Sequence, residues 1–326
     1  MHICRNWATL AGVLALGPAL VPATTLFMSP SGSDRNTGAS ATKALKTLQG
    51  VLDQVKVDKP KDAVKIVVAE GTYLSQTVVW NYFNGEPITF SPPTDAKTKP
   101  VFDGEGTGLT WFTMYDSTDA AKPTNLHFMG LKVTNYWLGL DLGRNKEPGN
   151  SQNEIRNMLF ERIGGFYTKG LPQPKGYAAL RMQRSRNNTI TGNRFHGVKN
   201  SANADGVDLT SYIHAIYAAH NATDNIILDN EFNQVTGDAV RTRDGSNNNL
   251  IEGNLFVAAG KYSAYSDWIA ETGDECPSYG NLFKDNTVGA GYFGHFKDGY
   301  ITHTYGPDDR CGTIPARITE DGTIVQ

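Results

Sequence analysis

The chain has 326 residues, 30 basic and 33 acidic side chains, and a formal net charge of -3 at pH 7. A balanced charge without a basic run argues against nucleic acid binding. The 34 glycines and asparagine runs such as residues 247–249 indicate many tight turns. A single compact core is improbable at this length, whereas a repetitive β-fold can grow by adding turns.

Residues 1–23 are predicted to be a signal peptide. Arg5 precedes an apolar run from Trp7 to Val21, and we place the cleavage site after Ala23, where small residues follow the run. The run covers about 15 residues and contains glycine and proline, whereas a membrane-spanning helix needs roughly 20 apolar residues. We therefore expect a secreted, extracellular protein without a membrane anchor.

A strand, a short helix and a second strand are predicted next. Residues 26–34 have the pattern of a strand that ends in a turn, and residues 62–73 form a second such pattern. Apolar residues at helical spacing predict a helix over about 42–56. These residues are Ala44, Leu45, Leu48, Val51, Leu52 and Val55.

These segments resemble the start of pectate-lyase-like proteins, a superfamily of right-handed parallel β-helices. The resemblance rests on Ser-Pro-Ser-Gly-Ser-Asp at 29–34, Leu48-Gln49 and Ala-Glu-Gly-Thr-Tyr at 69–73. It implies an all-β, single-stranded right-handed parallel β-helix, a solenoid, that forms one domain over 24–326. The helix would cap its N-terminal end, hiding core and unpaired backbone. Superfamily members include polysaccharide lyases, glycoside hydrolases, epimerases and adhesins, so this fold alone does not define the function.

Weaker repeats in the middle of the chain are interpreted as further turns of the coil. We align residues 126–128, 158–160, 193–195 and 286–288 with Asn230-Glu231-Phe232. The recurring asparagines are expected to hydrogen-bond along the stack. Uneven spacing indicates loops that shape a binding face. The longest are expected around 141–152, 167–176 and 199–211.

A regular repeat at a constant interval lies between Tyr212 and Trp268. Residues 216–218 are followed by 240–242 and then by 264–266. Stacked strands lie about 4.8 Å apart, and alternate side chains face opposite sides. If Ile216 faces the core, the outward-facing side chains are Tyr217, Arg241, Arg243, Tyr265 and Asp267.

This outward face is the predicted binding site. Arg181 and Asp141 extend its column upstream, while His214, His220, Asp238 and Asp244 lie at the edges of the same strands. Stacked arginines repel one another unless an anion lies between them. A uronic acid carboxylate would supply that anion, which favours an acidic polysaccharide as the substrate.

β-Elimination from a uronic acid requires neutralisation of the carboxylate, a base for the C5 proton and an acid for the leaving oxygen. We assign neutralisation to Arg241 and Arg243, and proton transfer to His214, Tyr217 and His220. The remaining predicted substrate-binding residues are Arg181, Asp238, Asp244, Tyr265, Asp267 and Trp268. The assignment predicts a polysaccharide lyase. A monomer is also expected.

Two other functions fit the same sequence. A glycoside hydrolase would need two carboxylates roughly 5 to 9.5 Å apart, and the candidates are Asp205, Asp208, Asp238, Asp244, Asp267 and Glu271. A non-catalytic solenoid could bind a glycan without turnover. The individual residues also have structural alternatives: Arg243 could pair with Asp267, and His214 shares the parity of the inward-facing Ile216.

The C-terminal part offers fewer predictions. Cys276 and Cys311 would form a disulfide, because Cys4 would leave with the signal peptide. Residues 295–326 are expected to cap the far end of the coil. No metal or cofactor is assigned, because no compact acidic loop has the spacing of a calcium site. Calcium is implied by the resemblance alone, since it often assists lyases of this superfamily.

Overall fold

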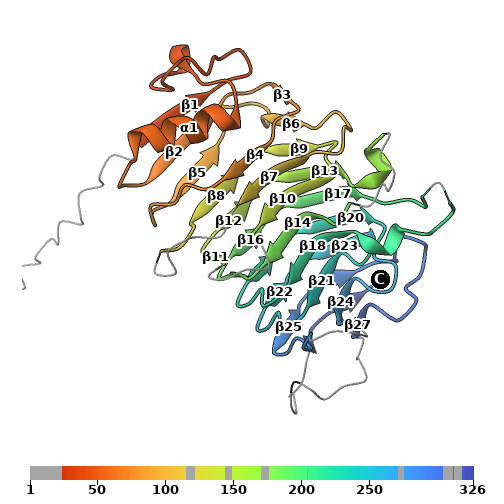
Figure 1. Cartoon of the computed structure of the whole chain (residues 1–326). Coiled ribbons are helices and arrows are strands. Elements are labelled where there is room, and N and C mark those ends of the chain that lie inside the picture. The colour runs from red at the N-terminus through yellow and green to blue at the C-terminus, as the bar shows by residue number, and fades with distance from the viewer. Residues whose placement is uncertain are drawn as a thin grey trace, which may run out of the picture.

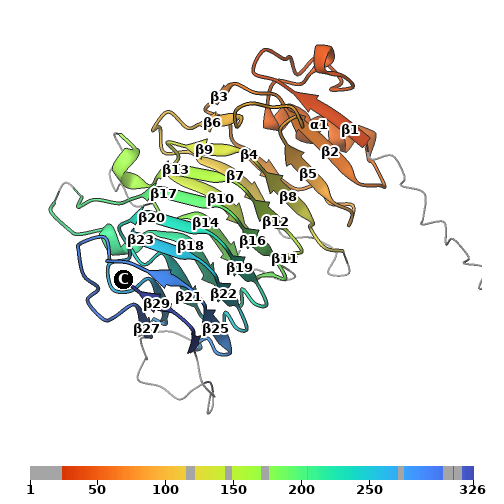
Figure 2. The same ribbon diagram turned by 180° about the vertical axis from the view of Figure 1, so that it is seen from behind.

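The computed structural model describes residues 24–114, 122–143, 149–169, 176–203, 205–270, 275–303, 311 and 318–326. The predicted signal peptide lies outside these residues. The described strands stack turn upon turn, and every pairing between the named strands is parallel. Figures 1 and 2 show this coil from two sides, with its turns following one another from the N-terminal to the C-terminal end. The predicted parallel β-helix is confirmed.

Three long sheets form the sides of the coil. The ten-stranded sheet contains β1 (Thr24–Met28), β2 (Val64–Val68), β5 (Ile88–Ser91), β8 (Leu126–Met129), β12 (Glu154–Arg156), β16 (Thr189–Thr191), β19 (Ile226–Leu228), β22 (Leu250–Glu252), β25 (Asn281–Lys284) and β28 (Ile318–Asp321). The nine-stranded sheet contains β3 (Thr72–Leu74), β6 (Val101–Asp103), β9 (Lys132–Thr134), β13 (Leu159–Ile163), β17 (Arg194–Val198), β20 (Glu231–Val235), β23 (Leu255–Ala259), β26 (Thr287–Val288) and β29 (Ile324–Val325).

The eight-stranded sheet carries the predicted site and is called the site sheet below. It contains β4 (Val78–Trp80), β7 (Thr110–Met114), β10 (Leu138–Leu142), β14 (Ala178–Gln183), β18 (His214–Ala219), β21 (Val240–Arg243), β24 (Tyr265–Trp268) and β27 (Ile301–His303). A small pair, β11 (Asn150–Ser151) and β15 (Ser185–Arg186), and the short 3₁₀-helices η2 (Gly165–Tyr167) and η3 (Thr210–Tyr212) lie between the long sheets in the chain.

The interior is a stack of apolar side chains from equivalent positions. Phe160, Phe195, Phe232 and Phe256 succeed one another along the nine-stranded sheet, with ring centroids 5.1, 5.2 and 4.8 Å apart. All four are buried. Alternation of apolar and polar residues places one such ring inside at each turn, and burial of these rings is a main contribution to stability.

The asparagine columns are confirmed as structural. Asn193, Asn230, Asn254 and Asn286 are buried at one bend of the coil. In Asn230, Asn254 and Asn286 the side-chain oxygen accepts the backbone N–H and the side-chain amide of the asparagine one turn before it, as Asn230 Oδ1 does from Asn193 at 2.9 Å for both bonds. Asn193 Oδ1 accepts the backbone N–H of Met158 at 2.9 Å. The ladder satisfies backbone groups that the bend removes from the sheets.

The N-terminal helix is present but begins later than predicted. The helix α1 spans Leu48–Asp58, and the 3₁₀-helix η1 spans Ala41–Lys43. Helix α1 begins after Thr47 because the Thr47 hydroxyl accepts the N–H of Gly50 at 2.9 Å and caps the first turn. Its apolar face is buried in the core, and it lies along the first strands in Figure 1.

Two parts of the predicted turn pattern are wrong. Residues 126–128 were aligned with 158–160, but the two segments lie in different sheets. Residues 126–128 belong to β8 of the ten-stranded sheet, where Phe128 pairs with Ile155. Leu159 belongs to the nine-stranded sheet and pairs with Lys132. The described residues near the C-terminus extend the sheets, because β28 pairs with β25 and β29 with β26. Residues 318–325 therefore continue the coil and do not cap it, unlike the cap predicted over 295–326.

The predicted disulfide between Cys276 and Cys311 is present.

None of the helices in the described part of the chain is long and apolar enough to cross a membrane.

Candidate functional site

The register of the site sheet agrees with the predicted repeat for one turn and departs from it in the next. Tyr217 pairs with Arg241 and Ala219 with Arg243, as predicted. Arg241, however, pairs with Ser266, one position later than the repeat predicts. The nine-stranded sheet keeps the original interval at Val235 and Ala259. The additional residue therefore lies between Ala259 and Tyr265, where Gly260 adopts a φ of 113°.

This shift reverses the side chains of β24. Tyr265 is buried, with its ring 5.7 Å from that of Phe283 and its hydroxyl 3.1 Å from Thr242 Oγ1. Burial raises the pKa of the Tyr265 phenol. Asp267 is also buried, and it accepts the Thr242 hydroxyl at 2.8 Å. The prediction that Tyr265 and Asp267 face outward is wrong, and neither lines the pocket described next.

A pocket of about 570 Å³ lies on the outer face of the site sheet. Its lining residues come from β14, β18, β21, β24 and β27 and from the loops beside them. They are Tyr177, Arg181, Gln183, Ser211, Tyr212, His214, Tyr217, Asp238, Arg241, Arg243, Tyr262, Ser266, Trp268, Asp298 and Thr302. Seven of the eleven predicted catalytic and substrate-binding residues line it; the other four are His220, Asp244, Tyr265 and Asp267.

One column of outward-facing residues crosses the pocket. Asp141, Arg181, Tyr217 and Arg241 lie at consecutive paired positions, and Ser266 follows them. Arg181 donates to Asp141 through Nε at 2.8 Å and through Nη2 at 2.6 Å. Such a two-point ion pair fixes the guanidinium plane. The placement of Asp141 beside Arg181 agrees with the sequence alignment.

The second arginine of the column has a buried partner. Arg241 donates through Nη2 to Asp238 Oδ2 at 2.6 Å and through Nε to Ser266 Oγ at 3.0 Å. Asp238 also accepts the backbone N–H groups of Tyr262 and Ser263 at 2.9 and 3.0 Å. Burial acts to raise the pKa of Asp238, but Arg241 and these hydrogen bonds outweigh it, so the pKa lies below its ordinary value. Asp238 is therefore an anion whose oxygens are already engaged.

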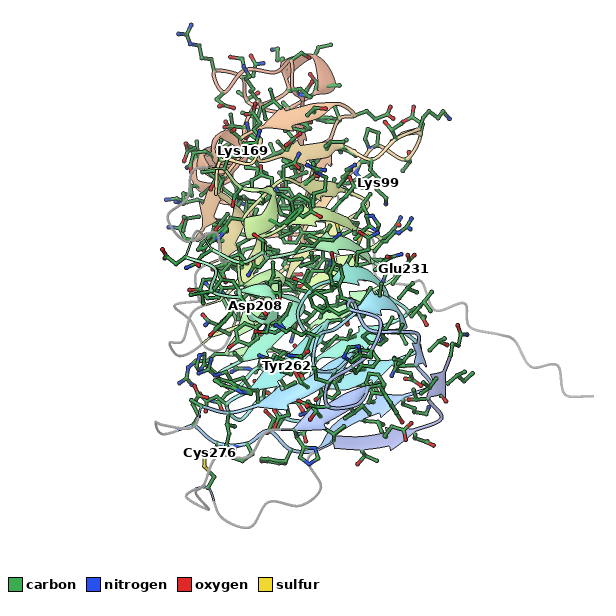
Figure 3. The ribbon with its side chains drawn as sticks, turned by 90° about the vertical axis from the view of Figure 1, so that its right-hand side faces the viewer. Lys99, Lys169, Asp208, Glu231, Tyr262 and Cys276 are labelled. Carbon is green, nitrogen blue, oxygen red and sulfur yellow. A yellow bond between two sulfur atoms is a disulfide. The ribbon has the colours of Figure 1, made fainter. Side chains whose placement is uncertain are left out.

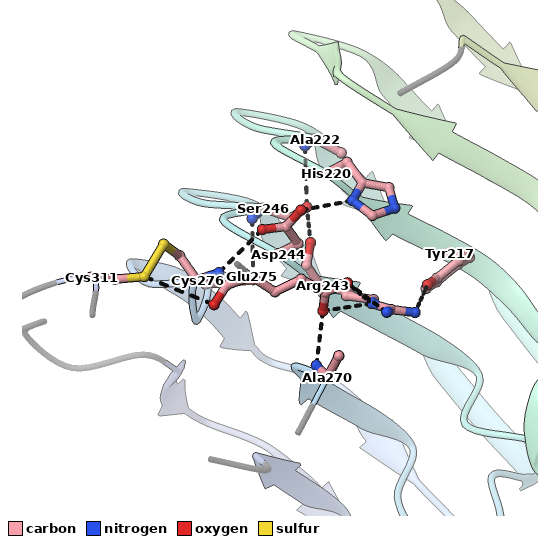
Figure 4. Close-up of polar contacts among 11 residues, drawn as sticks. Tyr217, His220, Ala222, Arg243, Asp244, Ser246, Ala270, Glu275, Cys276 and Cys311 are labelled. Atoms are coloured by element: carbon pink, nitrogen blue, oxygen red, sulfur yellow. Dashed lines mark hydrogen bonds and ion pairs between the residues drawn. A yellow bond between two sulfur atoms is a disulfide. The ribbon is translucent and has the colours of Figure 1, made fainter. Parts of the chain in front are cut away.

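Arg243 pairs with Glu275, so the alternative in which it pairs with Asp267 is wrong. Its Nε lies 2.9 Å from both Glu275 oxygens and its Nη2 lies 2.5 Å from Oε1. The third nitrogen, Nη1, donates to the Tyr217 hydroxyl at 3.1 Å (Figure 4). The guanidinium carbon lies 4.4 Å from the centroid of the Trp268 ring. Arg243 thus connects the phenol to an ion pair and to an aromatic platform.

His214 is buried beneath the pocket and contacts it with one edge. Its Nδ1 lies 2.7 Å from the backbone carbonyl oxygen of Asp238, which can only accept, so Nδ1 carries the proton. Burial, together with the charge of Arg241, lowers the pKa of this imidazole below its ordinary value. His214 is therefore neutral at pH 7, and its Nε2 carries a lone pair. Its ring centroid lies 5.2 Å from that of Tyr217.

His220 belongs to a separate cluster beside the pocket. Its Nδ1 lies 2.7 Å from Asp244 Oδ2, and potential ligand atoms of His220, Asp244 and Glu275 lie within 4.8 Å of one another (Figure 4). These residue types can hold a divalent metal. Both Glu275 oxygens, however, already bind Arg243, whose positive charge opposes a cation at this place. We therefore assign no metal to the cluster.

Carboxylates suitable for hydrolysis are scarce in the pocket. Asp238 and Asp298 are the carboxylates among the described lining residues, and Asp238 is fully engaged. Asp208 pairs with Lys261 outside this pocket, and Asp205 does not line it either. Glu271, a further hydrolase candidate, lies outside the described residues.

The sequence analysis missed several residues that line the pocket, and it missed Glu275, which binds the pocket residue Arg243. Ser266 would have followed from a repeat longer by one position in its last turn. Glu275 and Asp298 come from segments that follow no strand repeat, and Glu275 is recognisable only by its position next to Cys276. Tyr177, Tyr212 and Tyr262 also line the pocket from outside the strands. Aromatic and polar side chains of this kind are common where proteins bind sugars.

Comparisons with known proteins support the fold. No family model matches the chain, and no curated protein matches it. Among solved structures, an alginate lyase from Paenibacillus sp. str. FPU-7 is similar, with a TM-score of 0.56, 14% identity and coverage of 93% of this chain and 95% of that chain. Pectate lyase Pel9A is similar with a TM-score of 0.55, 13% identity and coverage of 93% and 78%.

A third structure, a rhamnogalacturonan lyase, has a TM-score of 0.54 and 14% identity over 82% of this chain and 68% of that chain. At these identities the similarity shows the fold of parallel β-helix polysaccharide lyases. The chemistry of this chain must be argued from its own pocket.

Proposed function

We propose that the protein is a secreted polysaccharide lyase that cleaves a uronic-acid-containing glycan in the site-sheet pocket. The observation that carries the proposal is the pairing of a neutral histidine with a phenol held by a guanidinium. His214 and Tyr217 lie side by side, and Arg243 donates to the Tyr217 hydroxyl. These groups can accept and return a proton without a pair of open carboxylates, which hydrolysis would need.

In the proposed reaction, the C5 proton of a uronate passes to Nε2 of His214. The electron pair forms the C4–C5 double bond as the bond from C4 to the leaving oxygen breaks, and Tyr217 gives its proton to that oxygen. Burial makes His214 a weak base in the free protein. The carboxylate of a bound uronate would raise the pKa of His214 and strengthen it as a base.

Arg181 and Arg241 are proposed to bind the substrate carboxylate. Each donates through Nε and Nη2 to side chains of the protein, which leaves its Nη1 hydrogens to donate to a ligand. Asp141 and Asp238 balance their charges, so the arginines do not require an anion to relieve repulsion, contrary to the argument from sequence. Recognition would instead rest on directed hydrogen bonds, with Trp268 and the pocket tyrosines packing against the sugar.

The proposal changes the roles predicted for four residues. His220 and Asp244 bond to each other outside the pocket lining and are proposed to stabilise the turn next to Glu275. Tyr265 and Asp267 are core residues. Secretion, the signal peptide over residues 1–23 and a monomeric state are parts of the same proposal, and the disulfide is compatible with an oxidising compartment.

A glycoside hydrolase is the second candidate, because Asp298 contributes an exposed carboxylate to the pocket. The test incubates the purified protein with alginate, polygalacturonate and rhamnogalacturonan. A lyase would generate ultraviolet absorbance from the unsaturated uronide, and Arg241→Ala would abolish it. New reducing ends without absorbance would instead establish hydrolysis and contradict the lyase proposal. Neither signal, with glycan binding intact, would indicate a non-catalytic glycan-binding protein.

A further inference from the structure

A second cavity adjoins the main pocket. It has a volume of about 220 Å³ and is lined by Asp208, Lys261, Phe293, His295 and Lys297. The backbone N–H of Lys297 donates to the carbonyl of Lys261 at 3.3 Å, and that of Asp298 donates to the carbonyl of Tyr262 at 3.1 Å. These bonds hold the two segments side by side. In each segment one residue lines the second cavity, Lys261 or Lys297, and the next residue lines the main pocket, Tyr262 or Asp298. The main pocket and the second cavity therefore share one wall.

The two lysines of this cavity differ in their charge balance. Lys261 has 7% of its side chain exposed, pairs with Asp208 and donates to Thr210 Oγ1 at 2.9 Å, so its charge is already neutralised. Lys297 is exposed, and its ammonium nitrogen lies 5.4 Å from the centroid of the Tyr262 ring. No carboxylate of the described residues pairs with it. Among the described residues, Lys297 therefore offers a positive charge at the shared wall that no carboxylate pairs with. Figure 3 labels Asp208 and Tyr262 on this side of the coil.

The same cavity contains an exposed aromatic side chain. Phe293 is 48% exposed, and its ring packs edge-on against Tyr292 with centroids 4.9 Å apart. An exposed aromatic ring next to a cation suits a ligand with an apolar face and a negative group. A uronic acid has both, because the C–H groups of its ring form an apolar face and its carboxylate is an anion.

We propose that this cavity is a subsite for a further uronate unit of the same glycan chain that occupies the main pocket. Lys297 binds the carboxylate of that unit, and Phe293 packs against its ring. Tyr262 lies between the two units, since it lines the main pocket while its ring contacts both Lys261 and Lys297. This inference rests on the proposed function, because it takes the main pocket to hold an acidic glycan.

The test is a calorimetric titration with disaccharides and hexasaccharides of polygalacturonate and of alginate, in a Tyr217→Phe background to prevent turnover. We expect at least one hexasaccharide to bind more tightly than its disaccharide. Lys297→Met keeps the aliphatic stem and removes the charge, and it should weaken that hexasaccharide about fivefold. Disaccharide binding should stay unchanged. The exposed Lys56→Met on α1, at the other end of the coil, is the matched control.

Two further readouts separate charge from packing. If the hexasaccharide that binds is hexagalacturonate, its methyl ester should bind equally to Lys297→Met and to its parent, because it has no carboxylates. Phe293→Ala should weaken both the acid and the ester. The inference is overturned if Lys297→Met binds every hexasaccharide as its parent does, or if no hexasaccharide binds. The unsaturated product is assayed separately on the protein that keeps Tyr217. Its absence there, with the Lys297 effect present in the binding assay, would refute the lyase proposal and leave the subsite standing.

Discussion

Arg243 is held by contacts on three sides, and each contact leads to a different part of the molecule. Glu275 binds it from the loop that carries Cys276, Trp268 stacks on it from β24, and Tyr217 receives its remaining donor from β18. Cys276 is in turn fixed to the coil, where its N–H donates to Asp244 at 3.2 Å. We therefore regard Glu275 as a positioning residue for the Arg243–Tyr217 pair.

Replacing the counter-ion of Arg243 should lower activity more than stability. In Glu275→Gln, the guanidinium loses its charged partner and the Tyr217 hydroxyl loses its fixed donor, so we expect kcat to fall roughly tenfold with little change in KM. The pH profile of kcat should also shift. Glu252→Gln is the control, since Glu252 forms an ion pair with Lys284 on another sheet. Equal effects of both variants would show that Glu275 has no special role.

The proton-transfer role of Tyr217 can be tested by removing one oxygen atom. Tyr217→Phe should reduce kcat by about 10²- to 10⁴-fold, the usual contribution of a positioned acid or base. Its melting temperature should stay close to the wild-type value, because the hydroxyl has one hydrogen bond at a partly exposed position. Absorbance of the unsaturated product measures the rate. Tyr279→Phe, outside the pocket, should be fully active; a fully active Tyr217→Phe would remove Tyr217 from the mechanism.

At the scale of elements, the coil is stabilised by groups that repeat from turn to turn. Asn230 accepts from the backbone and side chain of Asn193, and donates to Ile190 O at 2.9 Å and to Asn254 at 3.0 Å. Its side chain closes the bend between two sheets. Removal of one member therefore leaves buried donors and acceptors of two neighbouring turns without partners.

Asn230→Ala should lower the free energy of unfolding by about 3 kcal/mol, because each unsatisfied buried group costs roughly 1 to 3 kcal/mol. Denaturant unfolding followed by circular dichroism measures this loss. Asn233→Ala is the comparison, since Asn233 is partly exposed on the same strand, β20, and makes a long contact of 3.4 Å with Glu231. Similar losses for the two variants would contradict the importance of the ladder.

At the scale of the whole molecule, buried titratable groups should make the fold sensitive to acid. The pKa of His214 is lowered in the folded state, whereas an unfolded histidine titrates near about 6.5. Below this pH the unfolded chain binds the additional proton, so stability falls as pH falls, by at most about 1.4 kcal/mol per pH unit for one group. The depressed pKa values of Asp238 and Asp244 act in the same direction at lower pH.

Melting temperatures between pH 8 and pH 5 test this sign. The wild type should lose stability below about pH 6.5, and His214→Gln should show a smaller slope. His127 has a lowered pKa from burial as well, so His127→Gln should remove a separate part of the slope. A His214→Gln variant with the full wild-type slope would show that His214 does not titrate abnormally.

The disulfide should stabilise the C-terminal turns locally, because a solenoid transmits contacts only between adjacent turns. Cys276 and Cys311 are 35 residues apart, and closing a loop of this length contributes up to about 4 kcal/mol. Replacing both by alanine should increase hydrogen exchange in β24 and β25 and leave β2 and β5 protected. Uniformly faster exchange along the whole coil would contradict local stabilisation.

The amino-acid sequence by itself determined the architecture. Alternating apolar residues, recurring asparagines and the constant interval of the repeat are local patterns, and they correctly predicted the parallel coil, the ladder and the alignment of Arg181, Tyr217 and Arg241. The disulfide followed from counting cysteines. Each of these features depends on the order and spacing of residues within one or two turns of the coil, and both can be read directly from the sequence.

The tertiary structure decided the register of the third turn and the partners of the arginines. One additional residue near Gly260 reversed the side chains of Tyr265 and Asp267, since strand parity changes with every inserted residue. Glu275 and Asp298 reach the site from loops without a repeat. Which carboxylate neutralises which arginine depends on how such loops fold back onto the sheet, and no spacing in the sequence encodes that contact.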